Sequence, residues 1–451
     1  MTGVTGLVTL YTYDSDNRLI REDAGGRIYR YEYDNNGSVT ALVNPDGTRR
    51  TFEYNRDGQL TAKKDFQGNR TVYSYNNTGR LSSITDALGN QTAVEYDPEG
   101  NISKQTSPDG SVTSFAYDKM NRLGKVTEPG DVTALYQYDC MGSLAARLTT
   151  GVNPKTGESE QRKVLYRHTS SNRLASILNG EDEVEAESKA EIFTYTASDY
   201  MEKKAMPSGK EIACEYDKYN NIIKVSYEND PANTTSVSYS YDTWGRVTMT
   251  DDALGRVKLV YDLSGQLTKA TYSEGMEVQY EYNPWGELTR LTYPDGTAAE
   301  YTRDSMGRTT VLKDRDGKET LFEYDENGNA TKTTLPDGTV TATEYDALNR
   351  VTVKTNADRD GQLISRYAYE YDSMGRISRD VLTDENGDAV RTYQYDARGQ
   401  LIRYEELSSC GKVASEYTYD GFGNRISEVT EQDGKIVRRT FIYDGYDRLT
   451  S

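Results

Sequence analysis

Five stretches carry the pattern that decides the fold: YEYDNNGSV at 31–39, FEYNRDGQL at 52–60, YSYNNTGRL at 73–81, YSYDTWGRV at 239–247 and YEYDSMGRI at 369–377. In each, two aromatic residues two positions apart precede an Asp or Asn, and a Gly stands three residues after that Asp or Asn. About twenty copies of this unit follow one another, most often 21 residues apart. A fixed spacing of this length is the signature of a repeat architecture.

Each position in the unit has a structural interpretation. The alternation of Tyr31, Glu32 and Tyr33 is the period of two that places side chains on opposite faces of a strand. Asp or Asn is favoured at the first corner of a type I turn, and Gly tolerates the positive φ with which such a turn closes a hairpin with a bulge. The sequence therefore predicts a strand, a turn and a second strand in every unit.

The second aromatic of the unit serves as a reference, which we call the reference tyrosine. In LYRHTSSNRL at 165–174 this alignment makes Tyr166 the reference and places His168 in the turn, as a surface residue. We also consider that the tyrosine hydroxyls hydrogen-bond the turn carboxylates. The residues that we assign to the structural repeat are Tyr33, Asp34, Gly37, Tyr54, Gly58, Tyr96, Asp97, Tyr241, Asp242, Gly245, Tyr282, Gly286, Tyr371, Asp372 and Gly375.

A second turn recurs twelve residues after the reference tyrosine, most clearly as Pro-Asp-Gly at 45–47, 108–110, 294–296 and 336–338. Two turns in 21 residues leave two strands of about six residues, an ordinary strand length. One such unit buries too little apolar surface to fold alone, so neighbouring units must pair edge to edge. We therefore predict an all-β protein, one continuous antiparallel sheet of about forty strands that coils into a spiral wall because strand twist accumulates.

The composition excludes several classes of function. With 72 acidic against 53 basic residues and a net charge of -19, the averaged field repels nucleic acid. No stretch approaches the roughly 20 apolar residues of a membrane helix, and the first residues lack the pattern of a signal peptide. Leu, Val, Ile and Phe are scarce in this chain, and the 38 tyrosines supply the buried surface that those residues usually provide.

We expect no catalytic residues, no cofactor and no metal. The chain has three scattered cysteines and one histidine, which disfavours zinc sites and imidazole-based catalysis. Nearly all carboxylates occupy turn positions that the repeat explains. The acidic stretches at 314–319 and 356–362 lack the ligand spacing of a calcium loop, so we assign them to turns.

Trp244 and Trp285 share the slot three residues after the reference tyrosine. Other units place Met120, Met141, Tyr219, Met306, Leu348, Met374 or Phe422 there. We expect this slot to pack under its own turn. The alternative is a ladder of exposed apolar residues that binds an unfolded cargo or a glycan, with Trp244 and Trp285 as the ligand-stacking residues.

The pattern continues along the whole chain, so we predict a single array over 1–451 without a linker. Longer hairpin insertions are expected near 149–163 and 180–191, where the step between units increases. Polar insertions of this kind usually remain at solvated hairpin tips.

The signature YxYDxxGRL with its alternating Pro-Asp-Gly turn resembles the YD repeat of Rhs proteins, teneurins and the shell-forming components of insecticidal toxin complexes. The resemblance covers the chain from about Tyr11 to Leu449. It implies a spiralling β-hairpin shell around a large internal space. In bacterial members such a shell encloses a toxin, and in teneurins it supports cell-surface adhesion.

The resemblance therefore implies a noncatalytic shell segment whose partner is a polypeptide cargo from the same or a parent chain. The alternative is an adhesion wall that binds a cell-surface glycan or protein, and both interpretations imply a secreted or cell-surface location. The DPxG-rich segment that follows bacterial shells does not appear before Ser451. We accordingly expect a stretch of a longer polypeptide or a truncated member, without the autoproteolytic aspartates of the family.

Overall fold

The computed structural model describes residues 7–153, 157–179, 190–229, 236–443 and 448–450. Every strand of this part of the chain belongs to one antiparallel sheet, in which each strand pairs with the next along the chain (for example β3 with β4, and β4 with β5). The predicted all-β fold of about forty short strands is confirmed, since the described residues form 39.

The first 24 strands make up what we call the first coil. They are β1 (Thr9–Tyr13), β2 (Leu19–Ala24), β3 (Arg27–Tyr33), β4 (Val39–Val43), β5 (Arg49–Tyr54), β6 (Leu60–Lys64), β7 (Arg70–Tyr75), β8 (Leu81–Thr85), β9 (Gln91–Tyr96), β10 (Ile102–Thr106), β11 (Val112–Tyr117), β12 (Leu123–Glu128), β13 (Val132–Tyr138), β14 (Leu144–Val152), β15 (Ser159–His168), β16 (Leu174–Asn179), β17 (Glu191–Tyr195), β18 (Met201–Ala205), β19 (Glu211–Tyr216), β20 (Ile222–Glu228), β21 (Val237–Tyr241), β22 (Val247–Asp252), β23 (Gly255–Tyr261) and β24 (Leu267–Thr271).

The remaining elements make up the second coil. They are the 3-10 turn η1 (Ser273–Gly275), β25 (Glu277–Tyr282), β26 (Leu288–Thr292), β27 (Ala298–Arg303), β28 (Thr309–Lys313), β29 (Glu319–Tyr324), β30 (Ala330–Thr334), β31 (Val340–Tyr345), β32 (Val351–Ala357), β33 (Leu363–Tyr371), β34 (Ile377–Asp384), β35 (Gly387–Tyr395), β36 (Leu401–Ser408), β37 (Gly411–Tyr419), β38 (Arg425–Gln432) and β39 (Lys435–Thr440).

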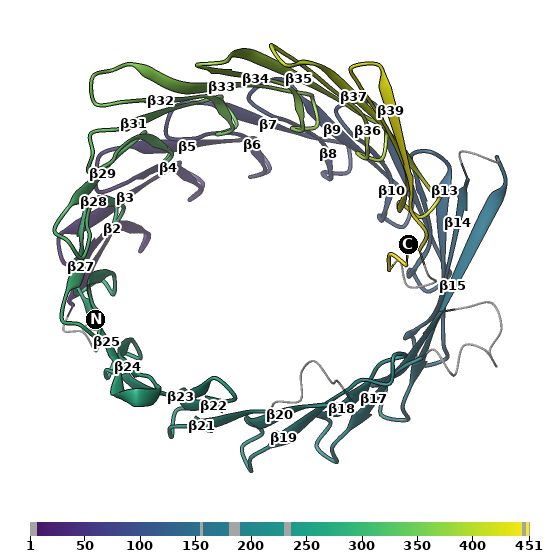
Figure 1. Cartoon of the computed structure of the whole chain (residues 1–451), viewed down its shortest axis with the longest axis horizontal. Coiled ribbons are helices and arrows are strands. Elements are labelled where there is room, and N and C mark those ends of the chain that lie inside the picture. Colours follow the sequence, from purple (N-terminus) through teal and green to yellow (C-terminus); the bar gives the residue numbers. More distant parts are fainter. Residues whose placement is uncertain (1–6, 154–156, 180–189, 230–235, 444–447, 451) are drawn as a thin grey trace.

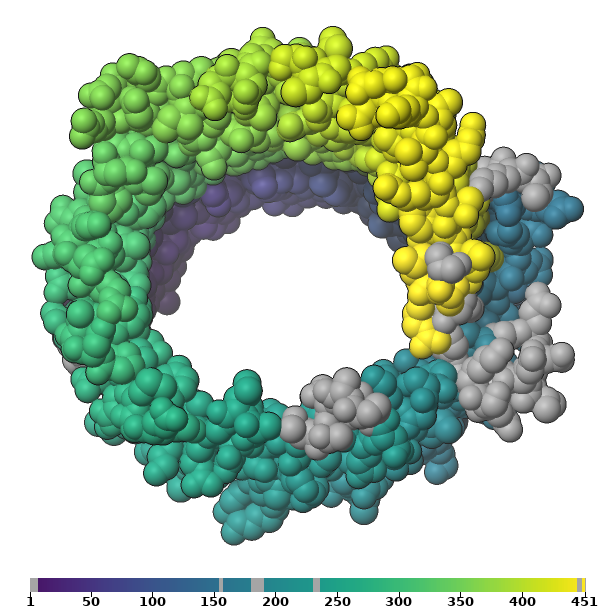
Figure 2. All heavy atoms as spheres, viewed as in Figure 1, coloured from purple at the N-terminus to yellow at the C-terminus, as the bar shows by residue number. Residues whose placement is uncertain are grey.

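The sheet winds into a spiral around an open lumen. In Figure 1 the strands from β2 to β14 pass behind the strands from β27 to β39, so the chain completes one circuit and continues into a second. Figure 2 shows the wall as a ring of atoms with an unfilled centre, and the purple start of the first coil lies behind the green and yellow second coil. The spiral predicted from accumulated strand twist is thus confirmed.

Two kinds of turn alternate along the meander and lie at opposite edges of the wall. We call the turns that follow the reference tyrosine, such as 34–37, the tyrosine turns, and those that lead into the next unit, such as 44–47, the return turns. In the tyrosine turn at 34–37 the Gly37 amide donates to the Asp34 carbonyl oxygen at 3.1 Å, and Gly37 has φ 87°. The pairing shifts at Glu32 and Tyr33, as expected for a hairpin that closes with a bulge.

The wall is one sheet thick, so its core is thin. The most deeply buried residues are small, with Ala41 and Ala62 completely buried and Leu178 the one large side chain that is almost fully enclosed among the described residues. Tyrosines are half-buried along the sheet. Packing in this fold therefore comes from contacts between neighbouring units and not from a central hydrophobic core.

Candidate functional site

The turn carboxylate holds the hairpin together from within. The Asp34 side chain accepts hydrogen bonds from the amides of Asn36 and Ser38, both at 2.9 Å. Asp97 and Asp242 play the same part in their own turns, where they bind the amides of Asn101 and Arg246. An Asp or Asn at this corner is thus needed for its side-chain oxygen as well as for its backbone preference.

The reference tyrosine joins its own unit to the preceding one. Its hydroxyl donates to the backbone carbonyl of the residue that begins the second strand of the preceding unit. The turn carboxylates are therefore not its acceptors, and our hypothesis of hydrogen bonds between tyrosine hydroxyls and turn carboxylates is wrong. The bond recurs at nearly constant length, with Tyr33 to Leu19 at 2.7 Å, Tyr96 to Leu81 at 2.8 Å, Tyr241 to Ile222 at 2.6 Å, Tyr282 to Leu267 at 2.8 Å and Tyr371 to Val351 at 2.6 Å.

The arginine that follows the last residue of the tyrosine turn, a Gly or an Asn, makes a second link between units. Arg376 donates through Nε to Asp372 of its own turn at 2.7 Å, and its guanidinium lies 4.6 Å from the ring centroid of Tyr395 in the next unit. Arg122 bridges Asp118 and Tyr138 in the same way. The Arg122 amide and guanidinium hydrogen bonds lower the pKa of Asp118, and burial raises the pKa of Tyr371. The Asp118 carboxylate therefore stays charged and accepts from Arg122, and the Tyr371 hydroxyl stays protonated and donates to Val351.

Replacing Tyr96 with Phe is expected to weaken the junction between two units. The ring stays in place, but the Leu81 carbonyl loses its donor, which should cost about 0.5–1.5 kcal/mol. Hydrogen exchange of β8 and β9 measures the loss, and Tyr219→Phe is the control because that side chain is 72% exposed. Equal protection in the two variants would contradict a bracing role for the hydroxyl.

The two coils meet along a seam, which we define as the contact of second-coil tyrosine turns with first-coil return turns. At its start the indole Nε1 of Trp285 donates to the Ala24 carbonyl oxygen at 2.7 Å, and the Arg27 guanidinium lies 4.3 Å from the Trp285 ring. Arg27 also forms a two-pronged ion pair with Glu287 at 2.7 and 2.9 Å. These side chains clamp β2–β3 to β25–β26, about 260 residues further along the chain.

The seam continues around the ring with the same polarity. Further contacts join Arg308 with Asp46 at 3.6 Å, Asn327 with Asp65 at 2.7 Å, Arg376 with Asp109 at 3.8 Å, Arg398 with Glu128 at 3.7 Å and Phe422 with the Arg162 guanidinium at 4.1 Å. In each contact the second coil contributes the tyrosine turn. Arg308 and Arg376 therefore each bind the carboxylate of their own turn and also contact a carboxylate of the neighbouring coil.

Two glycines permit the closest approach in the seam. A Cβ atom on Gly151 would lie 2.4 Å from the Gly421 carbonyl oxygen, and one on Gly421 would lie 2.7 Å from the Gly151 backbone. Neither glycine is needed for a positive φ, since neither has one. Both are needed because backbone meets backbone here.

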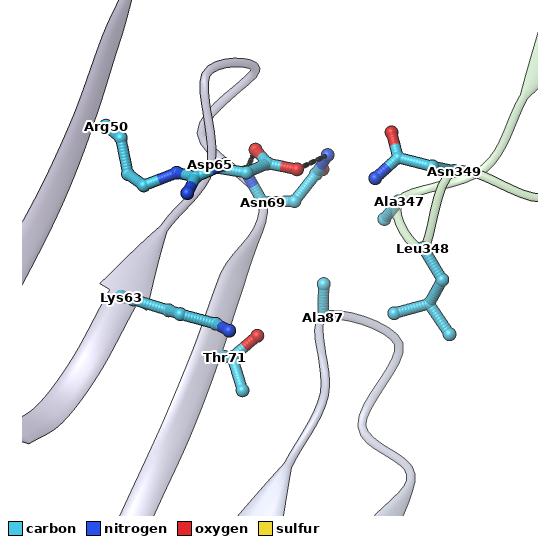
Figure 3. Close-up of a pocket in the computed structure, with 9 residues that line it drawn as sticks. All are labelled: Arg50, Lys63, Asp65, Asn69, Thr71, Ala87, Ala347, Leu348 and Asn349. Atoms are coloured by element: carbon cyan, nitrogen blue, oxygen red, sulfur yellow. Dashed lines mark hydrogen bonds between the residues drawn. The ribbon is translucent and has the colours of Figure 1, made fainter. Parts of the chain in front are cut away.

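A cavity of 260 Å³ lies within the seam (Figure 3). Arg50, Lys63 and Asp65 line it from the first coil, and Leu348 and Asn349 reach it from a green second-coil turn. Asp65 accepts hydrogen bonds from Asn69 at 3.0 Å and from Asn327. Burial opposes the charge of Asp65, but these bonds outweigh it and lower its pKa. The cavity is therefore a gap between the two coils that both charged and apolar side chains line.

Replacing Trp285 with Ala is expected to open the start of the seam. The indole is 37% exposed, so its loss should cost less than a core tryptophan does, roughly 1–2 kcal/mol. Trp244→Ala is the matched control, because Trp244 occupies the same slot in the first coil with 74% exposure. Urea unfolding of dilute protein compares the two, and an equal or larger effect of Trp244→Ala would contradict the seam.

A cluster in β34–β36 departs from the repeat. Asp380, which is 4% exposed, accepts a hydrogen bond from the Tyr393 hydroxyl at 2.7 Å and lies 3.3 Å from Arg391. Arg391 binds Glu406 at 3.0 Å, and Glu406 accepts the Tyr404 hydroxyl. Both acids are thus engaged by donors. Sequence reasoning missed this cluster, since its five polar residues stand on three strands and share no motif.

The cluster gives the fold a sensitivity to alkali. Burial and the bond to Asp380 raise the pKa of Tyr393, and burial and Glu406 raise the pKa of Tyr404 to about 12. A pKa raised in the folded state means that stability is complete below the unfolded value near 10 and falls as pH rises through the folded value. We expect urea midpoints to drop between about pH 10 and 12, and to drop less in Tyr393→Phe. Identical pH profiles for the two proteins would contradict this.

The structure corrects two interpretations of the sequence. His168, and not Tyr166, ends β15 and pairs with Leu174, as the reference tyrosines pair with the aliphatic residue after their turns. The histidine is half-buried and lies 3.8 Å from Asp139, so it is not a turn residue. The slot of Trp244 and Trp285 does not pack under its own turn, because Met120, Met141, Tyr219 and Trp244 are all about three-quarters or two-thirds exposed. Its members are less exposed in the second coil, where Trp285 and Met374 are 37% and 41% exposed.

The repeat residues assigned from the sequence lie as follows. The turn glycines Gly37, Gly58, Gly245, Gly286 and Gly375 all have positive φ. They and the tyrosines are distributed around the ring and do not converge on one point. Of the two predicted insertions, the first falls at the long hairpin of β14 and β15, while 180–189 lies outside the described residues.

Across the described ranges no three His, Cys, Asp or Glu side chains gather as a metal site would require. A helix of sufficient length and apolarity to traverse a bilayer is likewise not found in that part of the chain.

The sequence matches the Teneurin YD-shell family over residues 51–235 and 297–451, which is well over half of the chain. The chain belongs to the YD-shell family. The RHS repeat family matches residues 13–49, 216–257 and 261–298, which include most of the remainder. Sequence comparison with curated proteins gives no match.

Solved structures share the shell fold. The crystal structure of TcdB2-TccC3 is 14% identical with a TM-score of 0.53, and the match covers 97% of this chain and 27% of that one. The Photorhabdus luminescens Tc holotoxin pore is 15% identical with a TM-score of 0.52, covering 97% and 26%. The YD-shell chain described here thus spans about a quarter of the length of these relatives.

Proposed function

We propose that this YD-shell protein forms part of the wall of an Rhs-type shell that encloses a polypeptide cargo, from the same or a parent chain. The observation that carries the proposal is the seam, because it turns a ribbon of hairpins into a wall around a lumen. Tyrosine and arginine links stiffen the wall along the sheet, and the seam closes it between coils. The role is structural, without catalysis, cofactor or metal, and the protein acts outside the cell or at its surface.

The open lumen offers the proposed cargo a place, since Figure 2 shows the centre of the ring unfilled. The exposed surface of the wall carries paired charges between strands, such as Lys104 with Glu95, together with apolar side chains such as Val260 and Leu321, which are 46% and 42% exposed. A mixed surface of this kind can contact both the polar and the apolar parts of an enclosed polypeptide.

The proposal is tested by electron cryomicroscopy of the protein isolated from its native cells. We expect density of a polypeptide inside the ring, which mass spectrometry of the same particles would identify. A lumen that is empty in all particles, or a bound polypeptide that lies only on the outer face, would refute enclosure. The fold itself would survive that result.

A second candidate function is adhesion through a glycan or protein at the cell surface. The exposed ring of Trp244 favours it, since aromatic faces stack against sugars. Trp285 is the matched control, because it is half as exposed and its indole is engaged in the seam by Ala24 and Arg27. Binding to a glycan array that is lost in Trp244→Ala and kept in Trp285→Ala would support adhesion. Absence of binding, or binding that both variants keep, would exclude it.

A further inference from the structure

The seam has a polarity that a second copy of the chain could use. Its contacts join tyrosine turns to return turns, so the two edges of the wall are different and complementary surfaces. Trp285 and Glu287 of a tyrosine turn meet Ala24 and Arg27 of a return turn. A contact between unlike surfaces is heterologous, and it can repeat in one direction without closing.

The tyrosine turns of the first coil form one exposed edge, which we call the tyrosine rim. Its apolar residues stand in the slot that Trp285 fills in the seam. Their exposures are 75% for Met120, 69% for Met141, 72% for Tyr219 and 74% for Trp244, against 37% for Trp285. Large apolar side chains repeated on one edge mark an interaction surface.

The arginines of the tyrosine rim repeat the seam as well. Arg122 and Arg246 directly follow the last turn residue, Asn or Gly, as Arg308 and Arg376 do in the second coil. Arg308 and Arg376 each bind their own turn Asp and also reach an Asp of the first coil. Arg122 and Arg246 bind their own turn Asp in the same way.

The return turns from residue 252 onward form the opposite edge, the return rim. Its Pro-Asp-Gly turns contain Asp295 and Asp337, in the position from which Asp46 and Asp109 accept the seam arginines. Asp295 is about half exposed beside Arg315. The acidic members of the seam are thus repeated on the return rim, facing away from the first coil.

A segment of the return rim also resembles the segment that receives Trp285, with Leu254 in place of Gly25. Residues 23–28 read DAGGRI and clamp Trp285, and residues 252–257 read DALGRV. Beside this second copy lies a cavity of 420 Å³ lined by Leu254, Tyr272 and Met276. Leu254 is 96% exposed. The pattern that receives an aromatic turn in the seam is therefore present a second time, with apolar surface around it.

We infer that this chain self-associates head to tail, with the tyrosine rim of one copy on the return rim of the next. The occupant of each rim is a second copy because the chain carries both halves of its own seam. Copies stacked in this way extend the spiral wall along its axis. The inference does not depend on a cargo.

The test is sedimentation of the purified full chain from about 1 to about 100 µM, the range in which weak complexes form. The average mass should rise severalfold with concentration. Met120→Glu with Trp244→Glu should block the tyrosine rim, and Leu254→Glu with Asp337→Arg should block the return rim, so each variant stays monomeric. All four positions are turn residues, and an unchanged circular dichroism spectrum verifies folding.

Mixing the two blocked variants distinguishes head-to-tail from symmetric association. Each variant keeps the rim that the other lacks, so the mixture should form a one-to-one dimer that goes no further. Leu135→Glu, an exposed substitution within β13 and away from both rims, should associate like the unaltered chain. A monomer at every concentration, association that survives either rim variant, or a mixture that stays monomeric would overturn the inference.

Discussion

Replacing Asp380 with Ala is expected to lower the free energy of unfolding around β34–β36 by about 3 kcal/mol. The substitution removes a carboxylate that is almost completely buried and leaves Arg391 and the Tyr393 hydroxyl with one partner fewer. Glu406 still binds Arg391, so the loss of stability should lie at the lower end of the range of about 3–5 kcal/mol for removing one partner of a buried ion pair. Hydrogen exchange of the three strands measures the change locally, as an array of repeats need not unfold as one unit.

The controls for this prediction separate charge from contact. Asp380→Asn keeps a hydrogen-bond acceptor for Tyr393 and should cost less than Ala. Asp360→Ala removes an exposed carboxylate on the neighbouring hairpin and should change stability by less than about 0.5 kcal/mol. If Asp380→Ala were as mild as Asp360→Ala, the cluster would not support the wall.

Replacing Gly421 with Ala is expected to separate the coils near the end of the seam. The added methyl group would meet the Gly151 backbone at 2.7 Å, and a backbone cannot rotate away as a side chain can. The overpacking should cost roughly 1–3 kcal/mol. Hydrogen exchange should increase in β14 and β37, on both sides of the contact, although they lie far apart in sequence.

Gly124→Ala is the matched control for the seam glycine. A methyl group there has an ordinary contact of 3.6 Å with the Ala116 carbonyl oxygen, and the residue has no positive φ. Its effect should be neutral or slightly stabilising. An equal response to both substitutions would show that Gly421 is constrained by something other than the opposite coil.

The fold could be predicted from the sequence because its determinants are local. Asp34 and Gly37 specify a turn by themselves, and Tyr31, Glu32 and Tyr33 specify a strand through their alternation. Repetition then fixes the order of the sheet, since each unit can bury its faces only against its neighbours. The prediction took Tyr166 as the reference residue of its unit where the structure has His168. The error arose because a histidine stands in the place of the reference tyrosine in this unit.

The seam could not be predicted, because it depends on how far the sheet twists over some 260 residues. A small change of twist at each strand pair would bring a different return turn beneath Trp285. The same uncertainty explains the error over the tryptophan slot, whose burial is decided by the opposite coil and not by its own turn. The likeness of DAGGRI at 23–28 to DALGRV at 252–257 is visible in the sequence. Only the contacts of Ala24 and Arg27 with Trp285 show that the first of these segments receives a turn of the other coil.

The most direct test of the account is a distance across the seam. Spin labels at Gln67→Cys and Glu326→Cys, with the exposed Cys140 and Cys410 changed to Ser, report on the contact of Gln67 with Asp325. The spiral predicts a short distance with a narrow distribution, set by the length of the labels. An uncoiled sheet would separate the same turns by about 23 strand spacings, roughly 110 Å. A distance beyond the range of the measurement would contradict the seam, and with it the wall around a lumen.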